Sequence, residues 1–209
     1  MRAQVIVLAG PSGAGKSRLA ERLGLPVLRL DDFYKNGDDP TLPRITSGAN
    51  AGIVDWDHPD SWLHDDAMAA LDRLCREGRA DVPVYEIARD GRCGWTTLDL
   101  GGHDLFVAEG IFAQHVVPSC RESGLLAGAY CVRQHPVVTF WRRLTRDLRE
   151  RRKPPPVLVR RGLALMRDQQ RVVARAVAHG CLPVTPEQGH AAIQRLRHRR
   201  ESSWQPTRP

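Results

Sequence analysis

The chain has 209 residues, of which 42% are hydrophobic and 26% are charged. This length fits one domain, since domains commonly hold about 100–200 residues, and the apolar content excludes a disordered chain. No apolar run approaches the roughly 20 residues of a membrane-spanning helix, and the first residues lack the layout of a signal peptide. The sequence therefore predicts a cytoplasmic protein of one domain, with no membrane span.

Charge is distributed unevenly along the chain. The net charge is +7, but residues 1–132 carry −6 and residues 133–209 carry +13. The second part therefore favours anionic ligands, such as nucleic acid or a nucleotide phosphate, although a biased codon composition would also give an excess of arginine. The five cysteines are scattered and never paired as C-x-x-C, which favours neither a zinc site nor a disulfide framework.

Short apolar runs alternate with segments of helical spacing. The runs predict strands at residues 5–9, 26–30, 82–85, 105–108, 129–132 and 182–185. Such alternation is typical of an α/β fold in which helices flank a mostly parallel sheet.

The segments between the strands predict helices and one long loop. A helix is predicted from Pro59 to about Gly78, because apolar residues recur there on one stripe. Residues 36–57, rich in Gly, Pro and Asp, predict a functional loop. Further helices are expected over 137–152 and 158–179, and the polar end over 197–209 is expected to fray. A single domain would then span residues 1–196, with a lid at about 140–157.

Residues 10–17 read G-P-S-G-A-G-K-S, between the first predicted strand and a helix. This is the phosphate-loop pattern in the structural context that it requires. Its glycines let backbone N–H groups face the phosphates, while its lysine supplies charge and its hydroxyl binds Mg²⁺. The motif predicts a site for ATP and Mg²⁺ made by Gly10, Ser12, Gly13, Ala14, Gly15, Lys16 and Ser17.

Acidic residues follow two of the predicted strands. Asp31 and Asp32 come after the second strand, and Glu109 ends the fourth. The carboxyl ends of parallel strands lie along one edge of the sheet, and ligands of open α/β sheets bind at that edge. A carboxylate there can accept the proton of an attacking hydroxyl or help to hold the metal, which predicts phosphoryl transfer to an alcohol. A solvated helix cap is the alternative for the aspartate pair.

Six arginines lie within eleven residues of the helix predicted over 137–152. Arg143 and Arg146 are three residues apart and share a face. A helix that closes over a triphosphate could bring such guanidiniums to the charge that develops during transfer. A solvated surface face is the alternative.

Taken in order, these motifs resemble the uridine kinase family. The matching set is G-P-S-G-A-G-K-S, D-D-F-Y at 31–34, D-W-D-H-P-D at 55–60, P-V-Y at 83–85, A-E-G-I at 108–111 and R-R-L-T-R-D-L-R-E-R at 142–151. It covers about residues 5–160, and the family is related to phosphoribulokinase and pantothenate kinase. The resemblance implies a P-loop NTPase three-layer sandwich with an arginine-rich helical lid, which phosphorylates the 5′-hydroxyl of uridine or cytidine.

The resemblance also implies roles for single residues. Asp31 would be the general base, Asp57 would bind the sugar hydroxyls, Tyr85 would belong to the base pocket, and Glu109 would stand near the metal. The lid arginines that contact the phosphates or the acceptor would be Arg143, Arg146 and Arg151.

The chain departs from the family pattern near the base pocket. The family commonly has a histidine five positions after the tyrosine and an arginine two further on, where this chain has Asp90 and Arg92. Asp32 also stands where a serine is usual. These departures leave open another alcohol as acceptor, such as a pantothenate-like or ribosyl compound.

Two other classes of function are open to the sequence. One is a nucleotide-dependent protein that binds nucleic acid through its basic second part, and the other is a nucleotide sensor without an acceptor. No aromatic residue lies among the arginines to stack on bases, and the acidic first part would repel a phosphate backbone. Nucleic acid is therefore not the expected partner.

Overall fold

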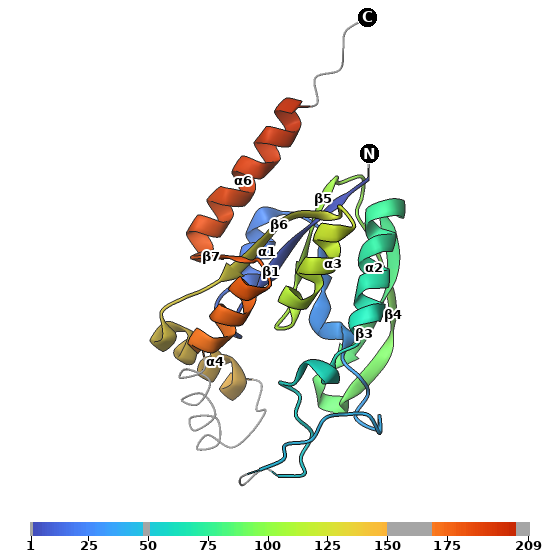
Figure 1. Ribbon diagram of the computed structural model, residues 1–209, viewed down its shortest axis with the longest axis vertical. Coiled ribbons are helices and arrows are strands. Elements are labelled where there is room, and N and C mark those ends of the chain that lie inside the picture. Colours follow the sequence, from blue (N-terminus) through green and yellow to red (C-terminus); the bar gives the residue numbers. More distant parts are fainter. Residues whose placement is uncertain (1, 48–50, 150–168, 204–209) are drawn as a thin grey trace, which may run out of the picture.

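A five-stranded parallel sheet forms the centre of the molecule (Figure 1). The computed structural model describes residues 2–47, 51–149 and 169–203. The strand order is β2-β5-β1-β6-β7. The strands are β1 (Gln4–Ala9), β2 (Val27–Arg29), β5 (Leu105–Glu109), β6 (Leu126–Val132) and β7 (Leu182–Val184). The predicted α/β fold with a mostly parallel sheet is confirmed.

Helices cover both faces of this sheet. The helices are α1 (Lys16–Leu23), α2 (His64–Glu77), α3 (Val117–Glu122), α4 (Pro136–Arg149), α6 (Pro186–Ser203) and a helical stretch at residues 169–178. Side chains of the central strand β1 alternate between two cores, as the period of a strand requires. Ile6 and Leu8 pack with α1 and α6, while Val5 and Val7 pack in the core that contains α2 and α3.

A separate antiparallel hairpin lies beside α2 (Figure 1). Its strands are β3 (Arg79–Glu86) and β4 (Gly91–Asp99). The prediction that residues 82–85 join the parallel sheet is therefore wrong, and β4 was not predicted. Along β3, Ala80 and Val82 are buried while Arg79 and Asp81 are exposed, and such alternation is typical of an antiparallel ribbon with one solvated face.

The helix predicted from Pro59 begins later than expected. Pro59–Ser61 form a short 3₁₀ turn, η2, and α2 starts at His64. Between them Trp62 is buried and extended, and its indole N–H donates to the Leu30 carbonyl oxygen at 2.7 Å. The extended backbone at Trp62 therefore separates the 3₁₀ turn from α2. The predicted end at Gly78 is confirmed.

A C-terminal helix that the sequence analysis did not predict, α6, follows β7. α6 continues to Ser203, so the expectation that residues 197–203 fray is wrong. Arg197 donates to the Leu23 carbonyl oxygen at 3.2 Å, and Arg200 contacts Asp104 at 3.1 Å, which holds this end of the helix against the domain. Residues 150–168 and 204–209 lie outside the described residues, and with them residues 150–157 of the predicted lid. Every helix in the described part of the chain falls short of what a membrane span needs.

Candidate active site

The loop between β1 and α1 has the curled backbone of a phosphate-binding loop. Gly10, Gly13 and Gly15 have φ angles of 132°, 84° and 99°, which L side chains rarely adopt. A Cβ on Gly10 would lie 2.3 Å from the Val132 carbonyl oxygen. Within the same loop, the Ala14 N–H donates to the Pro11 carbonyl at 3.2 Å. This backbone turns into the N-terminus of α1, where anions are stabilised.

Lys16 folds back over this loop. Its Nζ donates to the carbonyl oxygens of Gly10 at 2.8 Å and of Pro11 at 3.4 Å, and the residue is only 7% exposed. The ammonium group is therefore held inside the curve of the loop. A phosphate that enters the loop would replace these carbonyls as its partner.

Ser17 and Glu109 meet at the edge of the sheet that the carboxyl ends of the parallel strands form. The Ser17 Oγ donates to the Glu109 Oε1 at 2.9 Å. The pairing of β1 with β5 places Leu8 opposite Glu109, so the carboxylate lies beside the start of the phosphate loop. A hydroxyl and a carboxylate oxygen are the hard ligands that Mg²⁺ binds. Both residues that were predicted to hold the metal therefore fit a magnesium ion.

Asp31 is fixed at the same edge, in the 3₁₀ turn η1 (Leu30–Phe33) after β2. Its Oδ1 accepts a hydrogen bond from the Ile111 N–H at 2.8 Å. The missing side chain of Gly110 makes this approach possible, because a Cβ there would lie 2.7 Å from the Asp31 Oδ1. Since β2 and β5 are neighbours that pair Arg29 with Glu109, the structure brings Asp31 to the edge that holds the Ser17–Glu109 pair.

Asp32 makes different contacts from those of Asp31. Burial raises the pKa of Asp32, the nearby Arg29 guanidinium opposes this, and a hydrogen bond to the backbone of Tyr85 also lowers it. Arg29 Nε lies 3.6 Å from Asp32 Oδ2. Asp32 therefore ties η1 to the hairpin, while Asp31 is bound to the segment after β5.

Aromatic side chains gather around Tyr34, close to this edge. The Tyr34 ring centroid lies 5.7 Å from those of Trp56 and Tyr85, and 5.8 Å from that of Phe112. Burial and then the Asp90 carboxylate raise the pKa of Tyr85 to about 12, so its hydroxyl stays protonated. The sequence analysis singled out Tyr85 but missed Trp56 and Phe112 as members of the group, although Trp56 lies within the D-W-D-H-P-D motif and Phe112 directly follows A-E-G-I.

The other residues predicted for the acceptor lie at the periphery. Asp57 is exposed, and its N–H donates to the Asp55 carboxylate at 3.2 Å. Asp90, at the hairpin tip, has a left-handed φ of 45°. Arg92 pairs with Asp66 of α2 at 3.0 Å and lies over the Trp95 ring at 5.8 Å. The structure thus brings Asp90 near Tyr85 but directs the Arg92 guanidinium toward α2.

The arginine-rich helix reaches the phosphate loop. A Cβ on Gly15 would lie 3.5 Å from the Arg142 Nη1, so α4 carries a guanidinium to the nucleotide side of the site. Arg143 and Arg146 belong to the same helix, but their side chains, and the whole of Arg151, lie outside the described residues.

Comparison with known proteins identifies the family. A family model described as the Phosphoribulokinase / Uridine kinase family matches residues 5–178. The chain belongs to this family. The uridine kinase of Deinococcus deserti is 29% identical over 175 residues, which cover 80% of this chain and 79% of that protein. The predicted family and its P-loop kinase fold are therefore confirmed.

Two further proteins resemble this chain either over a small part of their length or in fold alone. The inorganic pyrophosphatase TTM2 of Arabidopsis thaliana is 27% identical over 114 residues, or 52% of this chain, but the match spans only 15% of that larger protein. A crystal structure from Silicibacter sp. TM1040, assigned as a fructose transport system kinase, superposes with a TM-score of 0.58 at 19% identity and covers 88% of each chain. That likeness supports the fold of the family.

Proposed function

We propose that the protein transfers the γ-phosphoryl group of ATP to the 5′-hydroxyl of a pyrimidine nucleoside, uridine or cytidine. The observation that carries this proposal is the convergence of Asp31, the Ser17–Glu109 pair and the aromatic group around Tyr34 at one edge of the sheet. Flat aromatic faces suit a planar base, and a fixed carboxylate suits a hydroxyl that must lose its proton.

The phosphate loop would hold the donor. Its backbone N–H groups would bind the phosphate oxygens, including that of Ser12 and, on release from the Pro11 carbonyl, that of Ala14; Lys16 would exchange its carbonyl partners for them. Ser17 and Glu109 would hold Mg²⁺, which when bound would supply positive charge to the phosphates of the donor. We assign the three lid arginines of the family pattern, Arg143, Arg146 and Arg151, to the phosphates as well.

The transfer itself needs one base and a set of cations. Asp31 accepts the proton of the 5′-hydroxyl as its oxygen bonds to the γ-phosphorus, and the bond from that phosphorus to the ADP oxygen breaks. Lys16 and the lid arginines neutralise the charge that develops. Asp57 binds the sugar hydroxyls, and the aromatic group excludes water, which limits hydrolysis of ATP.

A different alcohol is the second candidate acceptor, and Asp90 is the observation that favours it. An ionised carboxylate only accepts hydrogen bonds, so at the hairpin tip it suits the amino group of cytosine or the hydroxyls of a pantothenate-like or ribosyl compound. It does not suit the O4 of uracil.

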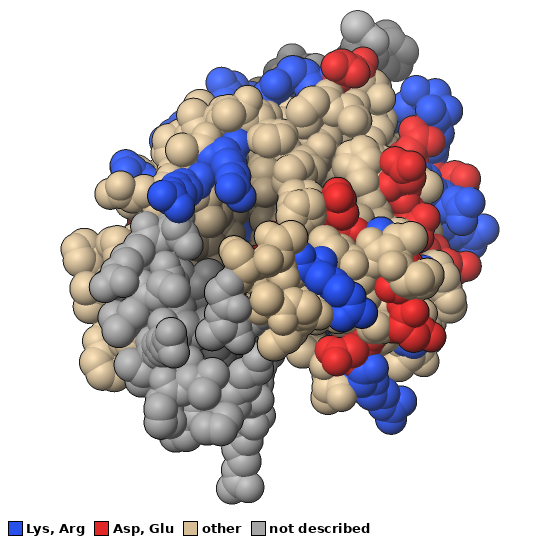
Figure 2. Space-filling view, turned by 60° about the horizontal axis from the view of Figure 1, so that its bottom comes forward, with Lys and Arg blue, Asp and Glu red and all other residues tan. Residues whose placement is uncertain are grey.

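Surface charge favours a small acceptor over nucleic acid. On the face that carries the loops, the acidic side chains gather on the side of α2 and the hairpin (Figure 2), which is the side of Tyr85. Acidic side chains that lie among the basic ones there (Figure 2) weaken the attraction of a polyanion. The use of ATP as donor also suits the cytoplasm as the place of action.

The deciding experiment measures ADP release with Mg²⁺ and ATP against uridine, cytidine, pantothenate and a set of free sugars, and identifies the product by mass spectrometry. We expect a 5′-monophosphate of cytidine, of uridine or of both. Phosphorylation of a non-nucleoside alone would select the second candidate. A shift of nucleic acid mobility without any acceptor-dependent ADP release would overturn both.

A further inference from the structure

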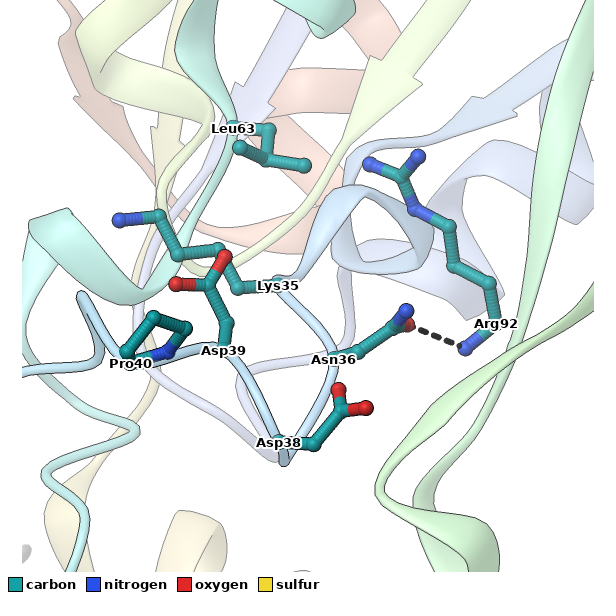
Figure 3. A pocket seen from close by; sticks show the side chains of 7 residues that line it. All are labelled: Lys35, Asn36, Asp38, Asp39, Pro40, Leu63 and Arg92. Carbon is teal, nitrogen blue, oxygen red and sulfur yellow. Dashed lines mark hydrogen bonds between the residues drawn. The ribbon is translucent and has the colours of Figure 1, made fainter.

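Two hydrogen bonds join the loop after Asp31 to the tip of the hairpin. The Asn36 side-chain Oδ1 accepts a hydrogen bond from the Arg92 N–H at 3.0 Å (Figure 3), and the Gly37 N–H donates to the Asp90 carbonyl at 2.6 Å. The partners of the first bond are 56 residues apart in the sequence. The loop and the hairpin are therefore connected at the point where the hairpin turns back.

The fit at this connection is close enough to exclude ordinary side chains. A Cβ on Gly37 would lie 2.9 Å from the Asp90 Cβ and 3.1 Å from its carbonyl oxygen. Asp90 itself has the left-handed φ of 45°. Aspartate is among the few residues that adopt this conformation, and two backbone hydrogen bonds hold it here, from the Asp90 N–H to the Ile87 carbonyl at 3.3 Å and from the Gly37 N–H to the Asp90 carbonyl.

A pocket lies beside this connection. A pocket of about 410 Å³ lies between the loop, the hairpin and the start of α2, lined among others by Lys35, Asp38, Leu63 and Arg92 (Figure 3). On the side of this pocket the contacts to the tip are polar: Asn36 accepts the Arg92 N–H from the loop side, and the Arg92 guanidinium pairs with Asp66 of α2.

We propose that Asn36 is a positioning residue, which fixes the hairpin tip relative to the base Asp31. The segment from Asp31 to Asn36 is bound at both ends, because Asp31 is held by the Ile111 N–H and Asn36 by the Arg92 N–H. These contacts fix how far Asp90, at the tip, stands from the reacting centre, while the hydrogen bond between Asp32 and the Tyr85 backbone holds the adjoining part of the hairpin. The effect on the acceptor rests on the proposed function, whereas the connection itself does not.

The test compares Asn36→Ala, Asn36→Asp and the control Asp38→Ala in the full chain. Asp38 is an exposed residue that lines the same pocket. In Asn36→Ala we expect amide hydrogen exchange at Arg92 to accelerate about 2- to 10-fold, the range that one hydrogen bond supports. With uridine and with cytidine as acceptors, KM should rise by a similar factor, while the KM for ATP and the ADP release without acceptor stay unchanged.

Asn36→Asp keeps an oxygen that accepts the same N–H, so it should restore both the exchange rate and the acceptor KM, and Asp38→Ala should match the wild type. Unchanged exchange in Asn36→Ala would overturn the connection. Faster exchange with an unchanged acceptor KM would overturn the positioning role. If the wild-type protein phosphorylates neither nucleoside, the proposed function fails, and the exchange rates alone decide whether Asn36 holds the hairpin tip.

Discussion

The Ser17 hydroxyl donates a hydrogen bond to the Glu109 carboxylate at 2.9 Å, although 92 residues separate the two in the sequence. The bond joins the phosphate loop to the neighbouring strand at the point where a metal would bind. It also means that neither side chain needs to move far to become a ligand.

Ser17→Ala should lower kcat/KM for ATP by about 100-fold, the upper end of what the loss of a partner around a metal costs. The variant removes a magnesium ligand and leaves Glu109 without its donor. The Mg²⁺ concentration needed for half-maximal rate should rise, whereas the melting temperature should stay close to that of the wild type. Ser17→Thr keeps the hydroxyl and should stay active. Full activity of Ser17→Ala at low Mg²⁺ would show that this hydroxyl binds no metal.

Asp31→Asn should lower kcat about 10²- to 10⁴-fold, the usual contribution of a positioned base, with little change in acceptor KM. The fold should be preserved, because the amide oxygen can still accept the Ile111 N–H. Asp32→Asn is the matched control, since it can still accept a hydrogen bond from Tyr85 and should keep most of the activity. The reverse ranking in steady-state kinetics would make Asp32 the base.

Gly10→Ala should destabilise the protein by about 2–4 kcal/mol, from steric overlap together with a strained φ. The new Cβ would lie 2.3 Å from the Val132 carbonyl oxygen, which belongs to a buried strand and cannot move aside. Gly24→Ala is the control, because Gly24 has a φ of 61° and no atom within 4 Å of the added Cβ, so that only the conformational cost of about 1–2 kcal/mol applies. Urea unfolding compares the two. Equal losses would mean that the phosphate loop has room for a side chain.

Stability should fall as the pH is lowered through the range in which His115 titrates. Burial, and next the neighbouring His179 ring at 4.8 Å, lower the pKa of His115 below its usual 6.5. The unfolded chain therefore takes up a proton before the folded chain does, and stability is lost as the pH falls from above 6.5 toward the folded pKa. The melting temperature of His115→Gln should depend less on pH between about 7.5 and 5.5. An unchanged slope in His115→Gln, equal to that of the exposed-site control His103→Gln, would contradict this.

Asp90→His should improve the use of uridine selectively. An ionised carboxylate opposite the O4 of uracil leaves two acceptors facing each other, which costs about 1–3 kcal/mol, or roughly 5- to 150-fold in discrimination. The wild type should therefore use cytidine at least as well as uridine. Asp90→Asn is the control, because asparagine tolerates the left-handed φ and keeps the shape of the side chain but removes its charge. A strong preference for uridine in the wild type that persists in Asp90→Ala would show that this side chain does not reach the base.

The phosphate loop illustrates what the sequence determined by itself. A β-branched run, three glycines and a lysine within residues 5–16 act over a few bonds, so the strand, the curled loop and the start of α1 follow from local chemistry. The same holds for β5 and for the second half of β6, because burial on both faces leaves a continuous apolar run. The end of α2 at Gly78 is equally local, since the left-handed φ there needs a glycine.

Only the tertiary structure decided which distant residues meet. The apolar run around Val82 shows that it is buried but not against what, and the partner is β4 and the face of α2 instead of the sheet. Trp62 interrupts a helical pattern because its ring has a place in the core and a donor partner at Leu30. Arg92, at the family position of a base-pocket arginine, binds Asp66 because α2 passes beside the hairpin. Each of these outcomes depends on strand pairing or packing between segments far apart in the chain, which a local pattern of residues does not encode.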